Sequence, residues 1–216
     1  MYRKVIKRGI DFIAAFIALL VLSPLFLFLI CWIKIDSKGT VFFKQKRIGI
    51  HKKYFYIYKF RTMYIDTPRD IPTHLLEEPQ KHITRAGRFL RKTSLDELPQ
   101  LINILKGEMS VIGPRPALWN QEDLIAERDQ YGANDVMPGI SGWAQINGRD
   151  ELPIEVKASL DGIYVKRMNF LFDLRCCLGT FVRVLRSDGI VEGRDGMFER
   201  KEIVATHEEH IDYGSR

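Results

Sequence analysis

Residues 12–33 read FIAAFIALLVLSPLFLFLICWI, and this stretch decides what kind of fold the chain can adopt. It contains 22 residues without a formal charge, which is long enough for a helix to cross the hydrocarbon core of a bilayer. Ser23-Pro24 interrupts the stretch near its middle. Proline removes a backbone hydrogen bond and clashes with the carbonyl four residues earlier, so a kink is expected at Ser23-Pro24.

Basic residues flank this apolar stretch on both sides, and the positive-inside rule favours the cytoplasm for both flanks. A helix that breaks at Ser23-Pro24 and returns to the same leaflet satisfies this rule, and the serine hydroxyl covers part of the freed backbone. A straight spanning helix that tolerates its proline is the alternative. A cleaved signal peptide fits least, because no small-x-small cleavage site follows before Lys34. The flanking basic residues are Arg3, Lys4, Lys7, Arg8, Lys34, Lys38, Lys44, Lys46 and Arg47.

The whole chain has 216 residues, of which 46% are hydrophobic, so it can bury one substantial core. We expect a re-entrant membrane helix over residues 1–35, a cytoplasmic domain at the membrane interface over 36–187 and a charged tail over 188–216. The formal net charge of +6 favours an anionic partner: nucleic acid, an anionic membrane or a phosphorylated substrate. The three cysteines show no disulfide framework, which indicates a reducing compartment.

The remaining pattern predicts an α+β fold that is predominantly helical. Two runs rich in aromatic and β-branched residues, 41–49 and 54–63, predict a small β-hairpin with its turn near Gly49. Residues 83–92 predict a short basic helix on an anionic membrane surface, with a solvated charged face as the alternative. Further predicted elements are a loop over 66–79, helices over 98–106, 119–131, 152–168 and 170–185, a rigid turn over 111–116 and a glycine-rich loop over 138–149.

Two adjacent acids, Asp96 and Glu97, precede one of these helices. Its apolar positions follow the i, i+3, i+4, i+7 spacing from Leu98 onward, and Gly107 is a natural stop. Asp96 is therefore expected near the positive end of the helix dipole, which favours its ionised form. Such a carboxylate can act as a nucleophile or as a metal ligand. Ser94 and Glu97 also fit a capping box, in which Glu97 only completes the helix cap.

Carboxylate attack on phosphorus requires that the negative charge of the phosphates be neutralised, which predicts Mg²⁺ and arginines near the acid pair. Arg115 stands between two prolines, a rigid frame that suits a phosphate clamp, with a structural salt bridge as the alternative. Arg149 closes a glycine-rich loop that can bring backbone amides to an oxyanion, although turn formation also explains its glycines. Lys59 and Arg61 alternate along the second strand and are expected on one face, either at phosphate or in solvent.

In order along residues 1–185, these motifs resemble those of the bacterial sugar transferases, the monotopic polyprenyl-phosphate phosphoglycosyl transferases. The chain looks like the minimal form of that family, since no second apolar run of about 18 residues follows the first. The motifs that carry the resemblance are Lys7-Arg8 with Asp11, the break at Ser23-Pro24, Lys59-Phe60-Arg61-Thr62-Met63, Ser94-Leu95-Asp96-Glu97-Leu98-Pro99-Gln100, Gly113-Pro114-Arg115-Pro116, and Pro138-Gly139-Ile140-Ser141-Gly142 with Asn147-Gly148-Arg149.

The resemblance implies transfer of a sugar-1-phosphate from a UDP-sugar to undecaprenyl phosphate, with release of UMP. It implies a monotopic catalytic domain on the cytoplasmic face of the bacterial inner membrane, attached by a re-entrant helix. Asp96 maps to the family's nucleophile, which forms a covalent phosphosugar intermediate, and Glu97 maps to the partner carboxylate that assists the acceptor or positions the site and magnesium. Arg115 and Arg149 map to phosphate-contacting arginines, and no role is carried over to Asp150, where family members often have asparagine.

The expected partners are therefore a UDP-sugar, undecaprenyl phosphate and anionic membrane lipids, with a homo-oligomer as a further option. Nucleic acid is not expected. A membrane-bound phosphohydrolase that uses the same carboxylate is the first alternative. The second is a non-catalytic scaffold at the membrane surface, in which the Asp96-Glu97 pair is only a helix cap.

Overall fold

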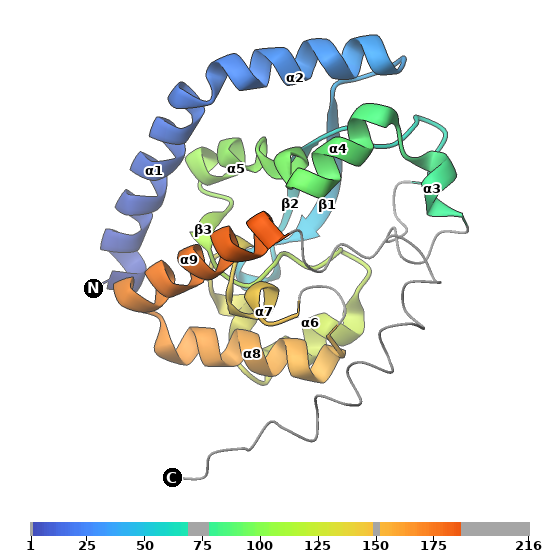
Figure 1. The fold of residues 1–216 in the computed structure, drawn as a ribbon. Helices are drawn as coiled ribbons and strands as arrows, with labels where there is room; N and C mark the ends of the chain where they lie inside the picture. Colours follow the sequence, from blue (N-terminus) through green and yellow to red (C-terminus); the bar gives the residue numbers. More distant parts are fainter. Residues whose placement is uncertain (1, 69–77, 149–151, 187–216) are drawn as a thin grey trace.

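The computed structural model describes residues 2–68, 78–148 and 152–186, and it is mostly helical (Figure 1). Two short strand pairs accompany the helices. β1 (Phe42–Ile48) and β2 (Tyr54–Phe60) form an antiparallel hairpin, and β3 (Ser110–Ile112) and β4 (Gly139–Ser141) form a parallel pair. The helices are α1 (Lys7–Val21), α2 (Ser23–Asp36), α3 (Pro79–His82), α4 (Arg85–Thr93), α5 (Gln100–Lys106), α6 (Glu122–Asp129), α7 (Trp143–Ile146), α8 (Ile154–Arg167) and α9 (Phe170–Arg186).

The apolar stretch forms two helices, α1 and α2, that are bent by 63° at the expected break. The hydroxyl of Ser23 donates a hydrogen bond of 2.8 Å to the carbonyl of Leu20. That carbonyl would accept from the amide of residue 24 in an unbroken helix, and Pro24 has no amide hydrogen. The serine thus replaces the donor that the proline removes, and the predicted kink is confirmed.

No helix within the described ranges is by itself long and apolar enough to cross a bilayer. The bent pair of α1 and α2 reaches the required length and composition only when both are counted together. The pair is therefore not straight, and its bend is compatible with either a broken spanning segment or a re-entrant one. Figure 1 shows the pair wrapping one corner of the molecule, with the rest of the fold inside the bend.

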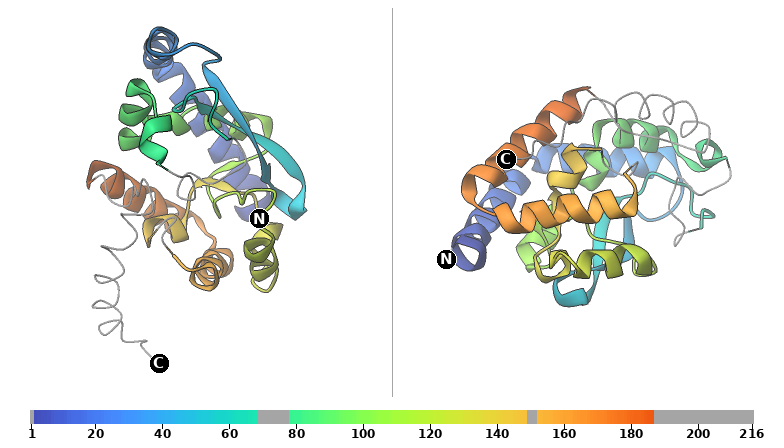
Figure 2. Two further views of the ribbon diagram at one scale, coloured as in Figure 1. Left: turned by 90° about the vertical axis from the view of Figure 1, so that its right-hand side faces the viewer. Right: turned by 90° about the horizontal axis from the view of Figure 1, so that it is seen from below.

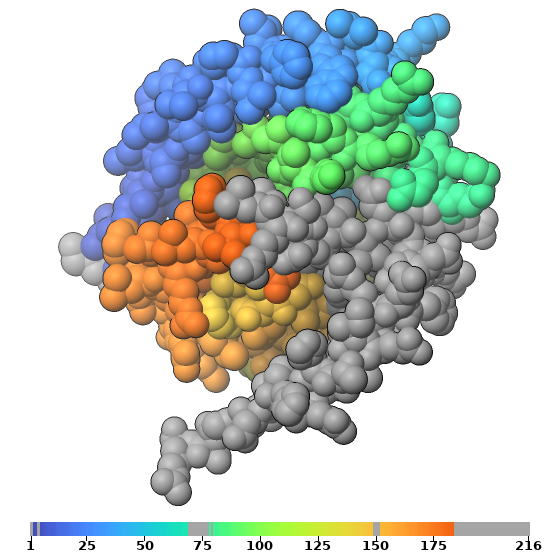
Figure 3. Space-filling model, viewed as in Figure 1, coloured from blue at the N-terminus to red at the C-terminus, as the bar shows by residue number. Residues whose placement is uncertain are grey.

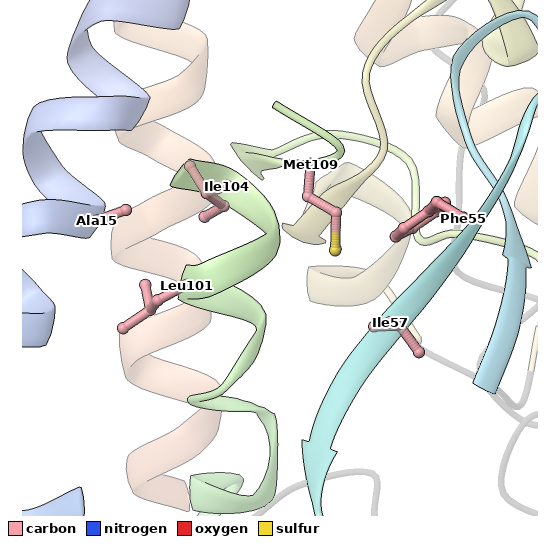
Figure 4. Close-up of a cluster of buried hydrophobic side chains, with 6 residues drawn as sticks. All are labelled: Ala15, Phe55, Ile57, Leu101, Ile104 and Met109. Atoms are coloured by element: carbon pink, nitrogen blue, oxygen red, sulfur yellow. The ribbon is translucent and has the colours of Figure 1, made fainter. Parts of the chain in front are cut away.

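The predicted hairpin is confirmed, and its inner face builds the first apolar cluster (Figure 4). Alternate residues of β2 point inward because successive side chains on a strand face opposite sides. They meet one face of α5, and α5 in turn packs against α1. The buried members are Ala15, Phe55, Ile57, Leu101, Ile104 and Met109.

A second apolar cluster joins α2 to α4, which lies directly against it in the space-filling view (Figure 3). Leu29 and Ile33 of α2 meet Leu90 of α4, and all three are almost completely buried. Leu95 and Leu98, which follow α4, pack against the same cluster. The segment after α4 is therefore seated on the second half of the bent pair.

The parallel pair of β3 and β4 corrects the prediction of a rigid turn over 111–116 and a loop over 138–149. These strands lie side by side because three glycines let their backbones approach closely. A Cβ atom on Gly139 would collide with the backbone nitrogen of Gly113, and one on Gly142 would collide with the Gly113 carbonyl. Close backbone packing is thus a structural reason for glycine at all three positions.

A buried polar network fixes the start of α1 to distant elements. Lys7 donates to Asp173 of α9 at 2.7 Å, and Tyr164 of α8 donates to the same carboxylate at 2.8 Å. Asp11 accepts from the Ser110 hydroxyl at 2.6 Å and from the backbone of the next residue of β3 at 3.2 Å. These contacts join α1 to the C-terminal half of the described chain.

The remaining helices agree with the sequence prediction in type and place. α6, α8 and α9 fall within or close to the predicted ranges, and α5 ends at Gly107, which adopts the left-handed conformation with φ 85°. The left view of Figure 2 shows the hairpin on one side of the molecule and α9 on the other. α9 leaves Leu171, Leu178 and Phe181 exposed, as expected for a largely apolar helix.

We expect Asp11→Ala to lower the free energy of unfolding by about 3 kcal/mol, because a buried hydroxyl and a partly buried amide on β3 lose their acceptor. Thermal or denaturant unfolding of the purified protein measures this loss. Asp123→Ala, at an exposed position in the first turn of α6, is the control and should change stability by no more than about 0.5 kcal/mol. Equal losses for the two variants would contradict the anchoring role of Asp11.

Candidate functional site

The acid pair lies on a tight turn between α4 and α5. α4 ends at Thr93, Ser94 adopts the left-handed conformation with φ 57°, and a single 3₁₀ turn follows over Leu95–Glu97. Pro99 sits just before α5, where a missing amide hydrogen costs nothing. Asp96 and Glu97 therefore lie outside the regular helix.

The capping-box reading of Glu97 is wrong, because the Ser94 side chain makes no cap hydrogen bond. The Glu97 carboxylate instead contacts two cations. Lys59 of β2 donates to Oε1 at 2.9 Å, and Arg115 donates to both oxygens, at 2.7 and 3.4 Å.

Asp96 lies farther from the neighbouring cations than Glu97 does. Its Oδ2 lies 3.9 Å from Lys59 Nζ, and its side chain is 13% exposed. Burial raises the pKa of Asp96 above its usual value, opposed by Lys59 and reinforced by the negative charge of Glu97. The sequence predicted that a helix dipole would favour the ionised form of Asp96. In the structure Asp96 lies in a 3₁₀ turn, and its burial favours the protonated form instead.

Glu97 shows the opposite behaviour. Burial opposes its ionisation, but Arg115 and Lys59 outweigh that cost and hold the pKa of Glu97 far below its usual range. The pKa values of the two neighbouring carboxyls thus shift in opposite directions, and the negative charge is concentrated on Glu97. This separation is typical of catalytic acid pairs that perform different roles.

Arg61 does not join this group. The prediction that Lys59 and Arg61 share a strand face is wrong, because β2 ends at Phe60. The buried Arg61 guanidinium donates to the carbonyls of Lys38 and Ser37, just past the end of α2, the latter at 2.7 Å. It therefore caps the C-terminal end of α2, and its predicted contact with phosphate stays a prediction.

The structure brings together Lys59, Asp96, Glu97 and Arg115. Arg149 lies outside the described residues, so its predicted phosphate contact also stays a prediction. Arg91, which was expected only on the basic face of its helix, is a further neighbour. Its Nε donates to Thr62 Oγ1 at 3.0 Å, and its charge lowers the pKa of Asp96. The sequence could have indicated this neighbour, because Arg91 lies only three residues before Ser94, on the helix that leads into the turn.

A metal ion at this site would have two carboxylates available. Within residues 2–68, 78–148 and 152–186, no three His, Cys, Asp or Glu side chains come together. Mg²⁺ commonly uses one or two carboxylates together with substrate phosphates, so the donor set of the pair fits this ion. Asp96 is the better candidate of the two, because the Glu97 oxygens already accept from Lys59 and Arg115.

Comparison with known proteins adds a family signature. Residues 2–187 match the family described as bacterial sugar transferase. The chain is 43% identical over 196 residues to a Bacillus subtilis (strain 168) protein named uncharacterized sugar transferase EpsL, which covers 91% of this chain and 95% of that protein.

Two longer relatives carry more specific names. One is a UDP-glucose:undecaprenyl-phosphate glucose-1-phosphate transferase of Xanthomonas campestris pv. campestris, 40% identical over 193 residues. The other is an undecaprenyl-phosphate galactose phosphotransferase of Salmonella typhimurium, 34% identical over 199 residues. Each match covers 85% of this chain but only 40% and 41%, respectively, of the relative, so the chain spans about two fifths of their lengths.

We expect Arg61→Met to lower the free energy of unfolding by about 2 kcal/mol, because the carbonyls that follow α2 lose a charged donor. Lys59→Met is the comparison within the same chain segment. It removes a cation from the acid pair, but it leaves the end of α2 capped. Hydrogen exchange at the end of α2, measured by mass spectrometry, should increase for Arg61→Met and not for Lys59→Met. An unchanged exchange rate for Arg61→Met would contradict the capping role.

Proposed function

The chain belongs to the bacterial sugar transferase family, and from this membership we propose that it transfers a sugar-1-phosphate from a UDP-sugar to undecaprenyl phosphate and releases UMP. The two longer relatives are named for this kind of reaction, with glucose or galactose as the sugar. The proposed location is the cytoplasmic face of the bacterial inner membrane. Anionic membrane lipids are proposed as further partners.

The turn that carries Asp96 gives this function its strongest support. It holds a largely buried carboxylate beside two cations, Lys59 and Arg115, that can neutralise phosphate charge. Leu95 and Leu98, on either side of the acid pair, pack against the α2 cluster. The same turn therefore connects a site for phosphate chemistry to the bent apolar helices.

We propose that α1 and α2 enter and leave a single leaflet. Both ends of the pair carry basic residues, and the outer surfaces of both helices expose large apolar side chains. This placement puts the catalytic turn close to the bilayer surface, where the phosphate of a polyprenyl lipid lies. The exposed side chains include Ile13, Phe16, Ile17, Leu20, Val21, Leu27 and Phe28.

In the first step, an oxygen of the Asp96 carboxylate attacks the sugar-proximal phosphorus of the UDP-sugar. A new acyl phosphate bond forms, the bond from that phosphorus to the bridging oxygen breaks, and the electron pair leaves with UMP. Lys59 and Arg115 stabilise the negative charge on the phosphate oxygens, and Glu97 keeps both cations in place. Mg²⁺, when bound by Asp96 and the diphosphate, would supply the positive charge that favours an ionised Asp96 and neutralises the leaving group.

In the second step, a phosphate oxygen of undecaprenyl phosphate attacks the phosphorus of the intermediate. The acyl phosphate bond breaks, and Asp96 recovers its carboxylate. The two steps use one site in turn, because the soluble nucleotide product leaves before the lipid reacts. This order predicts ping-pong kinetics.

Radiolabel trapping tests the covalent step. Without lipid acceptor, the wild-type protein incubated with a UDP-sugar labelled in the sugar should release UMP and retain label on Asp96. Asp96→Asn should retain none and should not exchange labelled UMP into the UDP-sugar, because an amide is a poor nucleophile. The exposed Asp123→Asn is the matched control and should behave as wild type.

Two further arms of this experiment separate the related hypotheses. EDTA should abolish labelling and Mg²⁺ should restore it if the ion supplies the charge described above. Addition of undecaprenyl phosphate should move the label to lipid, whereas release of free sugar phosphate without acceptor would indicate a phosphohydrolase. Exchange of UMP by Asp96→Asn would contradict the covalent mechanism.

Cysteine accessibility tests the placement of the bent pair. In a variant whose three native cysteines are replaced, we expect Arg3→Cys and Lys38→Cys to be protected from an impermeant maleimide added to intact bacterial spheroplasts. Both should react after the membrane is permeabilised, because both ends of the pair lie on the inner side. The cysteine-free parent controls for background labelling. Reaction of only one position in intact spheroplasts would indicate a spanning helix and contradict the re-entrant placement.

A further inference from the structure

The segment from Pro114 to Ala117, which carries Arg115, is held through its carbonyls. Two of its residues are prolines and have no amide hydrogen to donate, so at those positions the backbone can be held only through its carbonyls. Each of its four consecutive carbonyls instead accepts a hydrogen bond from a different donor. The bonds are Gly139 N to Pro114 O at 2.9 Å, Arg128 Nη1 to Arg115 O at 2.9 Å, Arg47 Nη1 to Pro116 O at 3.0 Å, and Ile48 N to Ala117 O at 3.0 Å.

The bond from Arg128 is made by a buried charge. Arg128 lies on α6 and is 3% exposed, and its Nε and Nη2 donate to Asp161 Oδ2 of α8 at 2.8 and 2.6 Å. Burying such a pair is costly, and apolar residues of similar size would often stabilise a fold as well. The remaining nitrogen, Nη1, reaches the Arg115 carbonyl directly. One guanidinium therefore ties α6 and α8 to the backbone of a site residue.

We infer that Arg128, oriented by Asp161, is a positioning residue that fixes Arg115 for phosphate contact. This inference rests on the proposed function, in which Arg115 neutralises phosphate charge. Arg128 acts through the backbone of Arg115 and does not touch the reacting atoms. Asp161 fixes the plane of the Arg128 guanidinium, because both Nε and Nη2 donate to one of its oxygens.

The geometry explains why Arg115 depends on this support. Its guanidinium meets Glu97 through two hydrogen bonds, an arrangement that tolerates little displacement. The prolines on either side limit rotation of the backbone but supply no donor of their own. Without Arg128, the Arg115 carbonyl loses its donor, and the guanidinium can shift relative to the acid pair. A displacement of about 1 Å can reduce catalysis on the order of 100-fold.

A double-mutant cycle on UMP release tests the inference. In full-length protein with UDP-sugar and undecaprenyl phosphate, Arg128→Gln should lower kcat/KM on the order of 100-fold when Arg115 is present. In an Arg115→Lys background, where the bidentate contact is already lost, the same change should cost less than about 3-fold. An equal factor in both backgrounds would show that Arg128 supports the fold generally, and it would overturn the inference.

Asn134→Ala is the matched control for loss of stability. Asn134 is also buried, and it donates to the carbonyl of Ile125 and to Asp129 Oδ1, both on the same helix, α6, and both at 2.8 Å. We expect this variant to lower the melting temperature while kcat/KM stays within about 3-fold of wild type. A loss of kcat/KM as large as that of Arg128→Gln would overturn the inference, because it would trace the effect to α6 as a whole.

Chemical modification gives a readout that needs no enzymatic activity. Phenylglyoxal reacts with accessible arginines, and the Arg115 side chain is 29% exposed in its pair with Glu97. Measured by peptide mass spectrometry, the modification rate of Arg115 should rise several-fold in Arg128→Gln and stay unchanged in Asn134→Ala. Arg128→Lys, which keeps a cation beside Asp161, is the variant of choice if Arg128→Gln does not fold.

These readouts separate the two hypotheses. If wild-type protein releases no UMP from any UDP-sugar, the proposed function fails, while the modification rate still decides whether Arg128 positions Arg115. An unchanged rate in a folded Arg128 variant overturns the inference, whatever the enzyme does. Increased modification together with a non-additive cycle supports both the inference and the function on which it rests.

Discussion

The structure depends on the cost of keeping two neighbouring carboxylates largely out of water. Asp96 and Glu97 lie on one short turn, with side chains that are 13% and 18% exposed. Unpaired charges in such a place would be strongly unfavourable, so the two carboxylates require cations beside them. Lys59 comes from the hairpin, and Arg115 comes from the proline-flanked segment. The hairpin and the segment from Pro114 to Ala117 thus hold these two side chains at the turn.

The polarity of the bent helix pair changes along its length. At the start of α1, Lys7 and Asp11 are buried in a polar network with β3 and α9. Near the break, the side chains are apolar and several are exposed, and the Ser23 hydroxyl satisfies the backbone that the proline disturbs. Charged groups thus fix the end of the pair that meets the domain, while the bend itself exposes no uncompensated carbonyl at Leu20.

Features with a local cause were predictable from the sequence. The break follows from Pro24, the hairpin from alternating aromatic residues, and the end of α5 from Gly107. The acid pair and Arg115 were identified by their neighbours in the chain. Long-range partners left no such signal. The sequence could not reveal that β2 ends before Arg61, or that Gly113 and Gly139 bring two strands together, because both depend on segments far apart in the chain.

The tie between Lys7 and Asp173 also has a consequence for how the chain is made. These residues are 166 positions apart, and at about 5 to 20 residues per second the second is synthesised about 10 to 30 s after the first. Throughout that interval the ammonium group of Lys7 is without the carboxylate that it meets in the folded protein. The polar network at the start of α1 can therefore be completed only after α9 has been synthesised.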